Sequence, residues 1–310
     1  MDLFDLHCDT AFECAAKLGG IDIRRGAGHL SLERGNYLNK WRQVFAIFMP
    51  DEYRGDAAVA HYNRVRDYIH SQAVAFSDRF RIVTNGSMLD DDFGGCNAII
   101  SVEGGSALAG DINRVQSLYD DGVRMITLTW NGANELADGI RVTDGGGLND
   151  FGFKVLEEME RLRMAVDVSH ISDAGFYDVA EHSKSPFVAS HSNARGLCRN
   201  ERNLTDDMIE IISSRGGLIG LNFYKEFLCD DGNASMHDII KHAEYMLSRG
   251  CENCLCLGSD FDGCEIASDM TGIESMNELY EEFLRMNYSE DLVRKIFSGN
   301  AESYFKNNIF

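Results

Sequence analysis

The sequence predicts an α/β fold of the (β/α)8 barrel class, in which eight parallel strands alternate with helices. Short apolar runs alternate with amphipathic stretches along the whole chain, which is typical of parallel β/α units. Eight such units follow one another, which favours closure into a barrel over the rival doubly wound sheet. The chain has 310 residues, of which 44% are hydrophobic, and this is enough for one large core. We therefore expect a single domain over residues 1–310.

The eight strands are predicted where short apolar runs stand between helical stretches. In order, these runs are 3–7, 44–48, 98–103, 125–129, 164–169, 187–191, 218–222 and 255–260. Amphipathic patterns between them predict helices at 57–76, 112–121, 151–162, 173–181, 206–213 and 237–248. A further apolar run, 80–84, is predicted to be a ninth short strand or a connector between a helix and a strand.

Charge and cysteine content narrow the possible partners. Lys and Arg total 29 against 50 for Asp and Glu, a formal net charge of -21, which repels nucleic acid and anionic lipid. We therefore expect neither as a partner. The N-terminus runs directly into a strand-like segment, and there is no long apolar stretch, so the expected compartment is the cytoplasm. The nine cysteines, an odd number, are expected to be reduced thiols there.

Metal-capable side chains fall at the C-terminal ends of five predicted strands. They are His7 and Asp9 at the first strand, Glu103 at the third, His170 at the fifth, His191 at the sixth and Asp260 at the eighth. In a closed barrel these ends meet on one face, where enzymes of this fold keep their active sites. His7 and Asp9 are two residues apart and point the same way from a strand. Together, these positions predict a metal site on that face.

Each of these residues, taken alone, also has a structural explanation. A His-x-Asp triplet can be a hydrogen-bonded pair, and a lone histidine at a strand end is more often a satisfied core or surface group. Asp260 and Asp262 could shape a turn. The joint pattern is much harder to explain by independent accidents. Imidazole and carboxylate ligands suit Zn²⁺, and two ions about 3.5–4 Å apart account for three histidines and two acids.

Eight short motifs in this order are similar to those of a known family. They are DLHCDT (5–10), SVEGG (101–105), TLTWN (127–131), DVSH (167–170), SHS (190–192), RNLTDD (202–207), NFY (222–224) and GSDFDG (258–263). Over nearly the whole chain, this set resembles the membrane (renal) dipeptidase family of zinc metallopeptidases, with the chain as a soluble bacterial-type member. The resemblance implies a metal-dependent barrel that holds two zinc ions per chain.

The resemblance also implies a role for each ligand. His7 and Asp9 would bind the first zinc ion, His170 and His191 the second, and Glu103 would bridge the two. A hydroxide between the metals would attack the peptide bond. The substrate would be a small dipeptide with free termini, and relatives suggest a homodimer.

Three further residues are expected at the substrate, beside a catalytic Asp260. The resemblance makes Asp260 the acid/base that moves a proton to the leaving amine. It makes Arg202 the group that meets the substrate's carboxylate, which its planar fork can grip with two hydrogen bonds. Tyr224 is a further expected contact. Trp130 stands where mammalian members have a substrate-contacting histidine, so it would orient substrate or wall the pocket.

Two other functions remain open. The site could serve another binuclear amidohydrolase-like enzyme that acts on N-acyl amino acids, cyclic amides or lactones, because fold and metals alone do not fix the substrate. A non-catalytic member that keeps the metal site is the third possibility. Arg202 favours a dipeptidase, and the intact Asp260 argues against the non-catalytic member. Cys251 and Cys254 have C-x-x-C spacing, but we expect buried thiols there because no second Cys/His cluster completes a zinc site.

Overall fold

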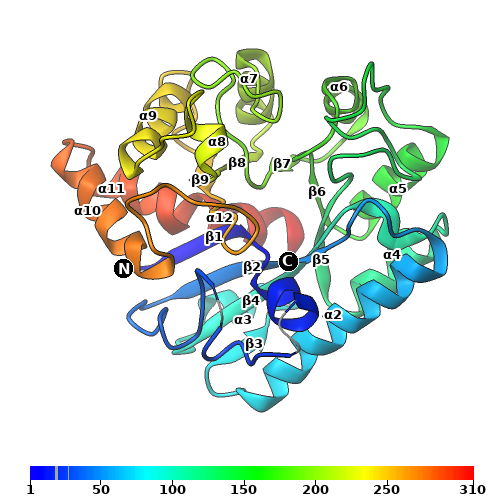
Figure 1. The fold of residues 1–310 in the computed structure, drawn as a ribbon, viewed down its shortest axis with the longest axis horizontal. Helices are drawn as coiled ribbons and strands as arrows, with labels where there is room; N and C mark the ends of the chain where they lie inside the picture. Colours follow the sequence, from blue (N-terminus) through cyan, green and yellow to red (C-terminus); the bar gives the residue numbers. More distant parts are fainter. Residues whose placement is uncertain (18–19, 27) are drawn as a thin grey trace.

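The computed structural model describes residues 1–17, 20–26 and 28–310, and its centre is a closed barrel of eight parallel strands (Figure 1). The strands are β1 (Leu3–Cys8), β2 (Trp41–Phe48), β4 (Cys96–Glu103), β5 (Val123–Thr127), β6 (Ala165–Asp167), β7 (Val188–Ala189), β8 (Leu218–Leu221) and β9 (Leu255–Leu257). β1 pairs with both β2 and β9, and β2 also pairs with β4, so the ring closes. The predicted barrel is confirmed over the doubly wound sheet.

The apolar run predicted at 80–84 forms a ninth strand outside the ring. This strand, β3 (Phe80–Ile82), pairs with the first residues of β4, from Cys96 to Ala98. β5 takes over from Ile100 onward. β3 therefore lengthens the sheet beside the N-terminal half of β4 and does not interrupt the order of the barrel.

The six predicted helices lie between the strands, with ends that differ by a few residues. They are α2 (Gly55–Ala75), α4 (Asn113–Asp120), α5 (Asp150–Arg161), α6 (Asp173–His182), α7 (Asp206–Ser214) and α9 (Met236–Leu247). Side-chain caps start three of them, because Asn149, Ser172 and Thr205 each accept a hydrogen bond from a backbone N–H of the first turn.

Further helical segments, most of them short, complete the part of the chain that the structure describes. In the connections these are α1 (Thr10–Phe12), η1 (Glu13–Lys17), α3 (Ser87–Asp90), η2 (Gly105–Leu108), α8 (Lys225–Leu228) and η3 (Ile273–Ser275). After β9 follow α10 (Met276–Arg285), α11 (Glu290–Arg294), η4 (Lys295–Gly299), α12 (Asn300–Tyr304) and η5 (Phe305–Ile309). Among the described residues, no helix is both long enough and apolar enough to cross a membrane.

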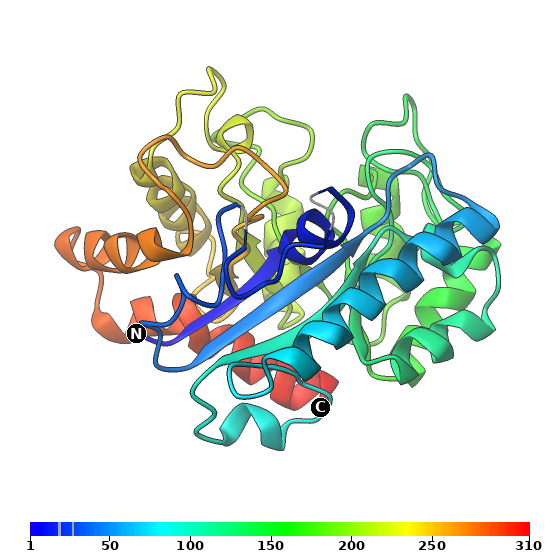
Figure 2. The same cartoon turned by 60° about the horizontal axis from the view of Figure 1, so that its bottom comes forward.

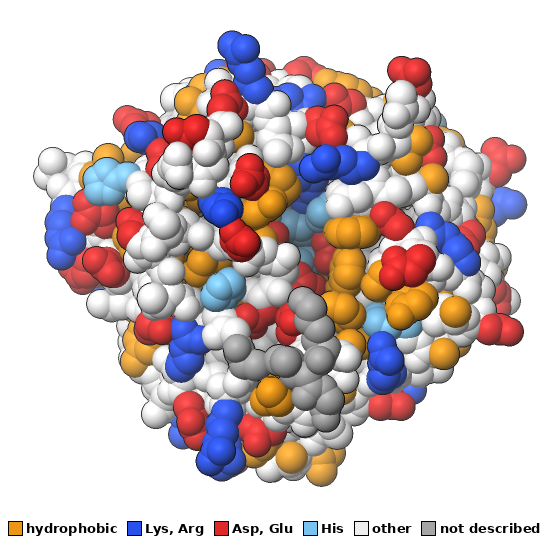
Figure 3. All heavy atoms as spheres, in the orientation of Figure 1, with side chains coloured by type: hydrophobic (Ala, Val, Ile, Leu, Met, Phe, Trp, Pro, Cys, Tyr) orange, Lys and Arg blue, Asp and Glu red, His pale blue; other side chains and the backbone are white. Residues whose placement is uncertain are grey.

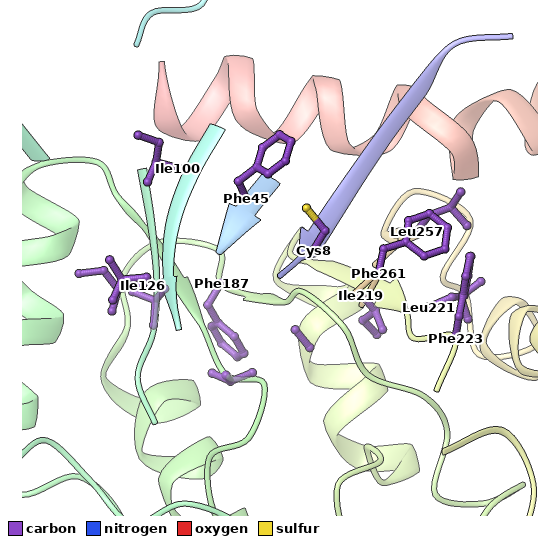
Figure 4. Close-up of a cluster of buried hydrophobic side chains, with 14 of the residues drawn as sticks. Cys8, Phe45, Ile100, Ile126, Phe187, Ile219, Leu221, Phe223, Leu257 and Phe261 are labelled. Atoms are coloured by element: carbon purple, nitrogen blue, oxygen red, sulfur yellow. The ribbon is translucent and has the colours of Figure 1, made fainter. Parts of the chain in front are cut away.

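Apolar side chains fill the barrel on both faces of its wall. The interior holds residues from every strand of the ring: Phe4, Leu6, Val44, Ile99, Met125, Ala165, Val188, Leu218 and Cys256. The last helical segment, formed by α12 and η5, adds Tyr304 and Phe305 to this cluster. Figure 2 shows this segment, in red, beneath the barrel. Alternate strand residues such as Phe45, Ile126 and Leu257 belong to the outer cluster (Figure 4). Cys251, Cys254 and Cys256 are buried, as predicted.

Five strands, β5 to β9, end earlier than predicted, and in three of them this changes where the candidate ligands lie. β6, β7 and β9 stop at Asp167, Ala189 and Leu257, so His170, His191 and Asp260 follow in the turns beyond the strands. His170 and Asp260 have backbone φ angles of 69° and 61°. A left-handed residue cannot continue a strand, because the strand region requires negative φ.

Candidate metal centre

Glu103, the last residue of β4, stands at the centre of the candidate site with its two carboxylate oxygens facing different groups. Its Oε2 lies 3.5 Å from His7 Nε2. Its Oε1 lies 3.0 Å from His170 Nε2 and 3.4 Å from His191 Nε2. The carboxylate is buried. One side chain therefore joins two groups of possible ligands that come from different strands.

The group on the Oε2 side contains two more carboxylates. His7 Nε2 lies 3.4 Å from Asp9 Oδ2 and 3.9 Å from Asp260 Oδ1. Ligand atoms of His7, Asp9 and Asp260 all lie within 4.8 Å of one another, a spacing that could hold a cation. Asp260 is anchored from behind, because its Oδ2 accepts a hydrogen bond of 3.1 Å from the Asn222 side chain. The structure thus brings together all six metal-capable residues that the sequence singled out.

The two histidines on the Oε1 side each have a polar partner at the other ring nitrogen. His170 Nδ1 lies 3.0 Å from Asn131 Oδ1, and His191 Nδ1 lies 2.7 Å from Ser190 Oγ. Their Nε2 atoms face each other at 2.9 Å. A ring whose Nδ1 is hydrogen-bonded in this way is free to present Nε2 to a metal, which is how metal-binding histidines are usually held.

The residues of the site fit a bound metal. Among the described residues, His7 Nδ1, His7 Nε2 and Asp9 Oδ1 are buried without a hydrogen-bond partner. Burial and the nearby Glu103 raise the pKa of Asp9 to about 7. Burial raises the pKa of Asp260 to about 6, with a further contribution from Glu103. Buried carboxylates that crowd one another are the environment that a divalent cation relieves, and the nitrogen and oxygen donors suit zinc.

An open cavity of about 850 Å³ lies directly over this cluster. Asp9, Glu103, His170 and Asp260 all line it. Figure 3 shows a hollow near the centre of this face, with acidic and histidine side chains inside it and hydrophobic side chains along one side. The possible ligands are therefore accessible to a small molecule.

Aromatic residues form one wall of the cavity. The ring of Trp130 packs edge-on against Phe48, with centroids 4.9 Å apart, and Phe48 packs in the same way against Phe12 at 5.1 Å. All three line the cavity, as does Tyr224, whose ring packs against Phe227. The structure thus places two of the three predicted substrate contacts, Trp130 and Tyr224, at the cavity.

Arg202, the third predicted contact, lies beside His191 and not at the surface of the cavity. Its side chain is buried, and its guanidinium donates to Ser192 Oγ at 2.8 Å and to the carbonyl of His191 at 3.1 Å. It is not among the described residues that line the cavity, whereas Arg141 is. The Arg141 side chain is 60% exposed and lies 3.4 Å from Glu201. Sequence reasoning missed Arg141, because an arginine in a long connection carries no signal of its own.

Asparagine residues that contact the site were also missed. Asn131 and Asn222 belong to two of the segments that resemble the family, TLTWN and NFY, but the prediction selected residues by their position at strand ends and so overlooked these neighbours. An asparagine in such a segment, close to a predicted strand end, was the sequence feature from which these contacts could have been predicted.

Comparisons with known proteins agree with the geometry. A family model described as membrane dipeptidase (peptidase family M19) matches residues 1–307. An uncharacterised Klebsiella pneumoniae protein from the pqqA 5′ region is 32% identical over 219 residues, which is 67% of this chain and 81% of that protein. Human dipeptidase 3 is 28% identical over 77% of this chain and 50% of its own length. The crystal structure of dipeptidase AC, an M19 metallopeptidase, superposes with a TM-score of 0.92 at 25% identity, covering 100% of this chain and 99% of that one.

Proposed function

Because this chain belongs to the membrane dipeptidase family, and is thereby a metallo-dipeptidase that hydrolyses peptide bonds, we propose that its substrates are small dipeptides with free termini. One observation carries this proposal beyond the family. Glu103 divides its two oxygens between two groups of ligands on the floor of an open cavity. That arrangement suits a binuclear hydrolase, because one carboxylate placed in this way can serve as a ligand to two ions.

The metals that we propose are two zinc ions per chain. His7 and Asp9 would hold one, His170 and His191 the other, and Glu103 would lie between them. When bound, such a pair lowers the pKa of a water molecule and polarises the scissile carbonyl. The distances from Glu103 to His7, His170 and His191, all 3.5 Å or less, support this assignment.

Asp260 is the proposed proton carrier. It lines the cavity, and Asn222 holds one of its oxygens while the other faces the cluster. A carboxylate in this position can take a proton from the attacking water and give it to the leaving amine. The raised pKa of Asp260, about 6, brings it closer to neutrality, which favours such transfer.

Arg202, Trp130 and Tyr224 are the proposed substrate contacts. Trp130 belongs to the aromatic wall, so we assign it the packing of a substrate side chain; its indole N–H can donate but cannot shuttle a proton. For Arg202 to meet a carboxylate, its side chain must become accessible from the cavity. Arg141 already is, so it is the alternative partner for that carboxylate.

The position of Arg202 also keeps a second function in view. If no arginine meets a substrate carboxylate, the same centre could act on N-acyl amino acids, cyclic amides or lactones, since metals and barrel do not select among them. For the whole molecule we propose one domain over residues 1–310, a cytoplasmic location and a homodimer. The formal net charge of -21 supports the absence of nucleic-acid and membrane partners.

To test this proposal, the metal content and the rates of hydrolysis of different substrates are measured on one preparation of the protein. We expect about two zinc ions per chain, loss of activity on chelation and recovery with zinc, and weaker binding of both ions by Glu103→Ala, because both share that ligand. C-terminal amidation of a dipeptide should lower kcat/KM by about 30- to 1,000-fold, the usual effect of losing a buried charge-assisted pair.

Arginine variants then identify the group that recognises the carboxylate. The acid-to-amide ratio should collapse in Arg202→Met or, if the alternative holds, in Arg141→Met. Equal rates on acid and amide forms in the wild type, together with turnover of N-acyl amino acids or lactones, would replace the dipeptidase proposal by the second function. A zinc-replete wild type that binds no metal would remove the binuclear centre.

A further inference from the structure

Asp167, the last residue of β6, is a buried carboxylate that lies beneath the metal centre without lining the cavity. Its Oδ1 accepts backbone N–H bonds from Ser169 at 3.0 Å and from Ser190 at 2.9 Å. Its Oδ2 accepts hydroxyl bonds of 2.6 Å from both Ser190 and Thr127. Four donors thus surround the group, and this is the full set that an ionised carboxylate can use.

These hydrogen bonds determine which atom is the donor between Ser190 Oγ and His191 Nδ1. Because an ionised Asp167 can only accept, the Ser190 hydroxyl must donate its proton to Asp167. Only lone pairs of Ser190 Oγ then remain for His191 Nδ1, which lies 2.7 Å away. His191 Nδ1 must therefore carry the ring proton, which leaves the lone pair on Nε2. That nitrogen lies 3.4 Å from Glu103 Oε1, on the side of the candidate second metal.

We propose that Asp167 and Ser190 are positioning residues that act through His191. They hold its ring in one orientation and in the tautomer that presents Nε2 as a ligand. The inference rests on the proposed metal centre. It extends the usual carboxylate–histidine–metal arrangement by one hydroxyl group, which stands between the acid and the imidazole.

A second buried aspartate, which also binds a serine, allows the effect on His191 to be separated from a general effect on stability. Asp5, in β1, accepts from Ser259 N at 2.8 Å and from Ser259 Oγ at 2.5 Å, so it fastens the turn before Asp260 much as Asp167 fastens the turn before His191. The two serines differ in the second group that each hydroxyl oxygen contacts. Among the described residues, the one further acceptor that Ser259 Oγ contacts is the backbone carbonyl of His7, at 3.3 Å. Ser259 therefore supports a turn, whereas Ser190 also holds a ring.

The experiment compares Ser190→Ala with the matched variant Ser259→Ala. Each removes one buried hydroxyl that donates to a buried aspartate, so both should lower the thermal stability of the metal-free protein to a similar extent. Ser190→Ala alone should weaken zinc binding, measured by competition with a chromophoric chelator. We expect a loss of about 10- to 100-fold for one of the two ions, the usual effect of removing such a partner. Ser190→Thr keeps the hydroxyl and should restore the affinity.

A second measurement reads the tautomer directly. In the metal-free protein labelled with ¹⁵N-histidine, His191 should show a protonated Nδ1 in the wild type and in Ser259→Ala. In Ser190→Ala that signal should give way to a mixture of tautomers. The proposal is overturned if Ser190→Ala leaves zinc affinity and the His191 tautomer unchanged, if both serine variants weaken zinc equally, or if the wild type binds no zinc. Zinc binding without dipeptide hydrolysis would instead refute the proposed function alone.

Discussion

At the scale of the residue, Asp260 occupies a place that allows two chemical roles. Its Oδ1 is 3.9 Å from His7 Nε2, close enough to share a cation with His7 and Asp9, yet it also lines the cavity where a leaving group would depart. Replacing Asp260 by a neutral residue of the same shape distinguishes the two roles. Loss of a ligand would weaken metal binding, whereas loss of a proton carrier would slow turnover. Asn keeps the shape of Asp but cannot accept and return a proton.

Asp260→Asn should therefore retain both metals while kcat falls by about 10²- to 10⁴-fold, the usual contribution of a positioned acid/base. Metal content and kcat are measured on one preparation. Loss of a metal ion would make Asp260 a ligand instead. The matched control is Asp262→Asn, because Asp262 is also an acid of this turn but its oxygens are occupied by the Thr10 hydroxyl and the His29 N–H, each at 2.5 Å. Full activity in Asp260→Asn would end its assignment as the proton carrier.

At the scale of the element, helix α9 is joined to the turn beyond β7 by a buried histidine. His242 Nδ1 accepts a hydrogen bond of 3.1 Å from the backbone N–H of Ala194, and its Nε2 donates to the carbonyl of Leu228 at 3.0 Å. Only the neutral ring can do both. Burial lowers the pKa of His242, and the nearby charges of Asp238 and Lys241 act in opposite directions.

Because the folded pKa of His242 lies below the unfolded value of about 6.5, the neutral ring stabilises the fold above that pH, and this contribution is lost as pH falls from about 6.5 towards the folded pKa. His242→Gln can keep one donor and one acceptor but does not titrate. We expect it to be less stable than wild type by about 1–3 kcal/mol at neutral pH, with a gap that narrows at pH 5.

Chemical unfolding of the metal-free proteins measures this difference in the free energy of unfolding at each pH. The residues of the metal site titrate in both proteins, so their contribution cancels between wild type and variant. Val74→Ala, at an exposed position of α2 that cannot titrate, serves as the control and should show no such narrowing. A gap for His242→Gln that stays constant from pH 7.5 to pH 5 would mean that the ring does not titrate with unfolding.

At the scale of the whole molecule, the two ends of the barrel have separate tasks. The C-terminal strand ends carry the candidate metal centre and its cavity, while the opposite end is closed by the last helical segment. Phe305 packs there against Phe4 of β1, with ring centroids 5.0 Å apart, and both side chains are fully buried. This division is usual for barrels of this class, in which one face supplies activity and the other stability.

Phe305→Ala should therefore destabilise the fold by about 3–5 kcal/mol, the typical cost of removing a buried phenyl ring, and leave kcat of the folded enzyme unchanged. Chemical unfolding and steady-state kinetics at a temperature where the variant is folded check the two parts. Val74→Ala, at a side chain that is 81% exposed, should change stability by about 0.5 kcal/mol or less. A large fall in kcat for folded Phe305→Ala would show that the two ends are coupled.

The barrel and the set of metal-capable residues could be predicted from the amino-acid sequence alone. Strand and helix periods are local, so eight β/α units could be recognised, and residues at the strand ends or just beyond them, such as Glu103 and His191, converge in any closed barrel. Other features of the site could not be predicted in this way. The left-handed turns at His170 and Asp260, the burial of Arg202, the cavity position of Arg141 and the chain from Asp167 through Ser190 to His191 all depend on contacts between segments far apart in sequence. Periodicity carries no record of such contacts, because it reports only which face of an element is apolar.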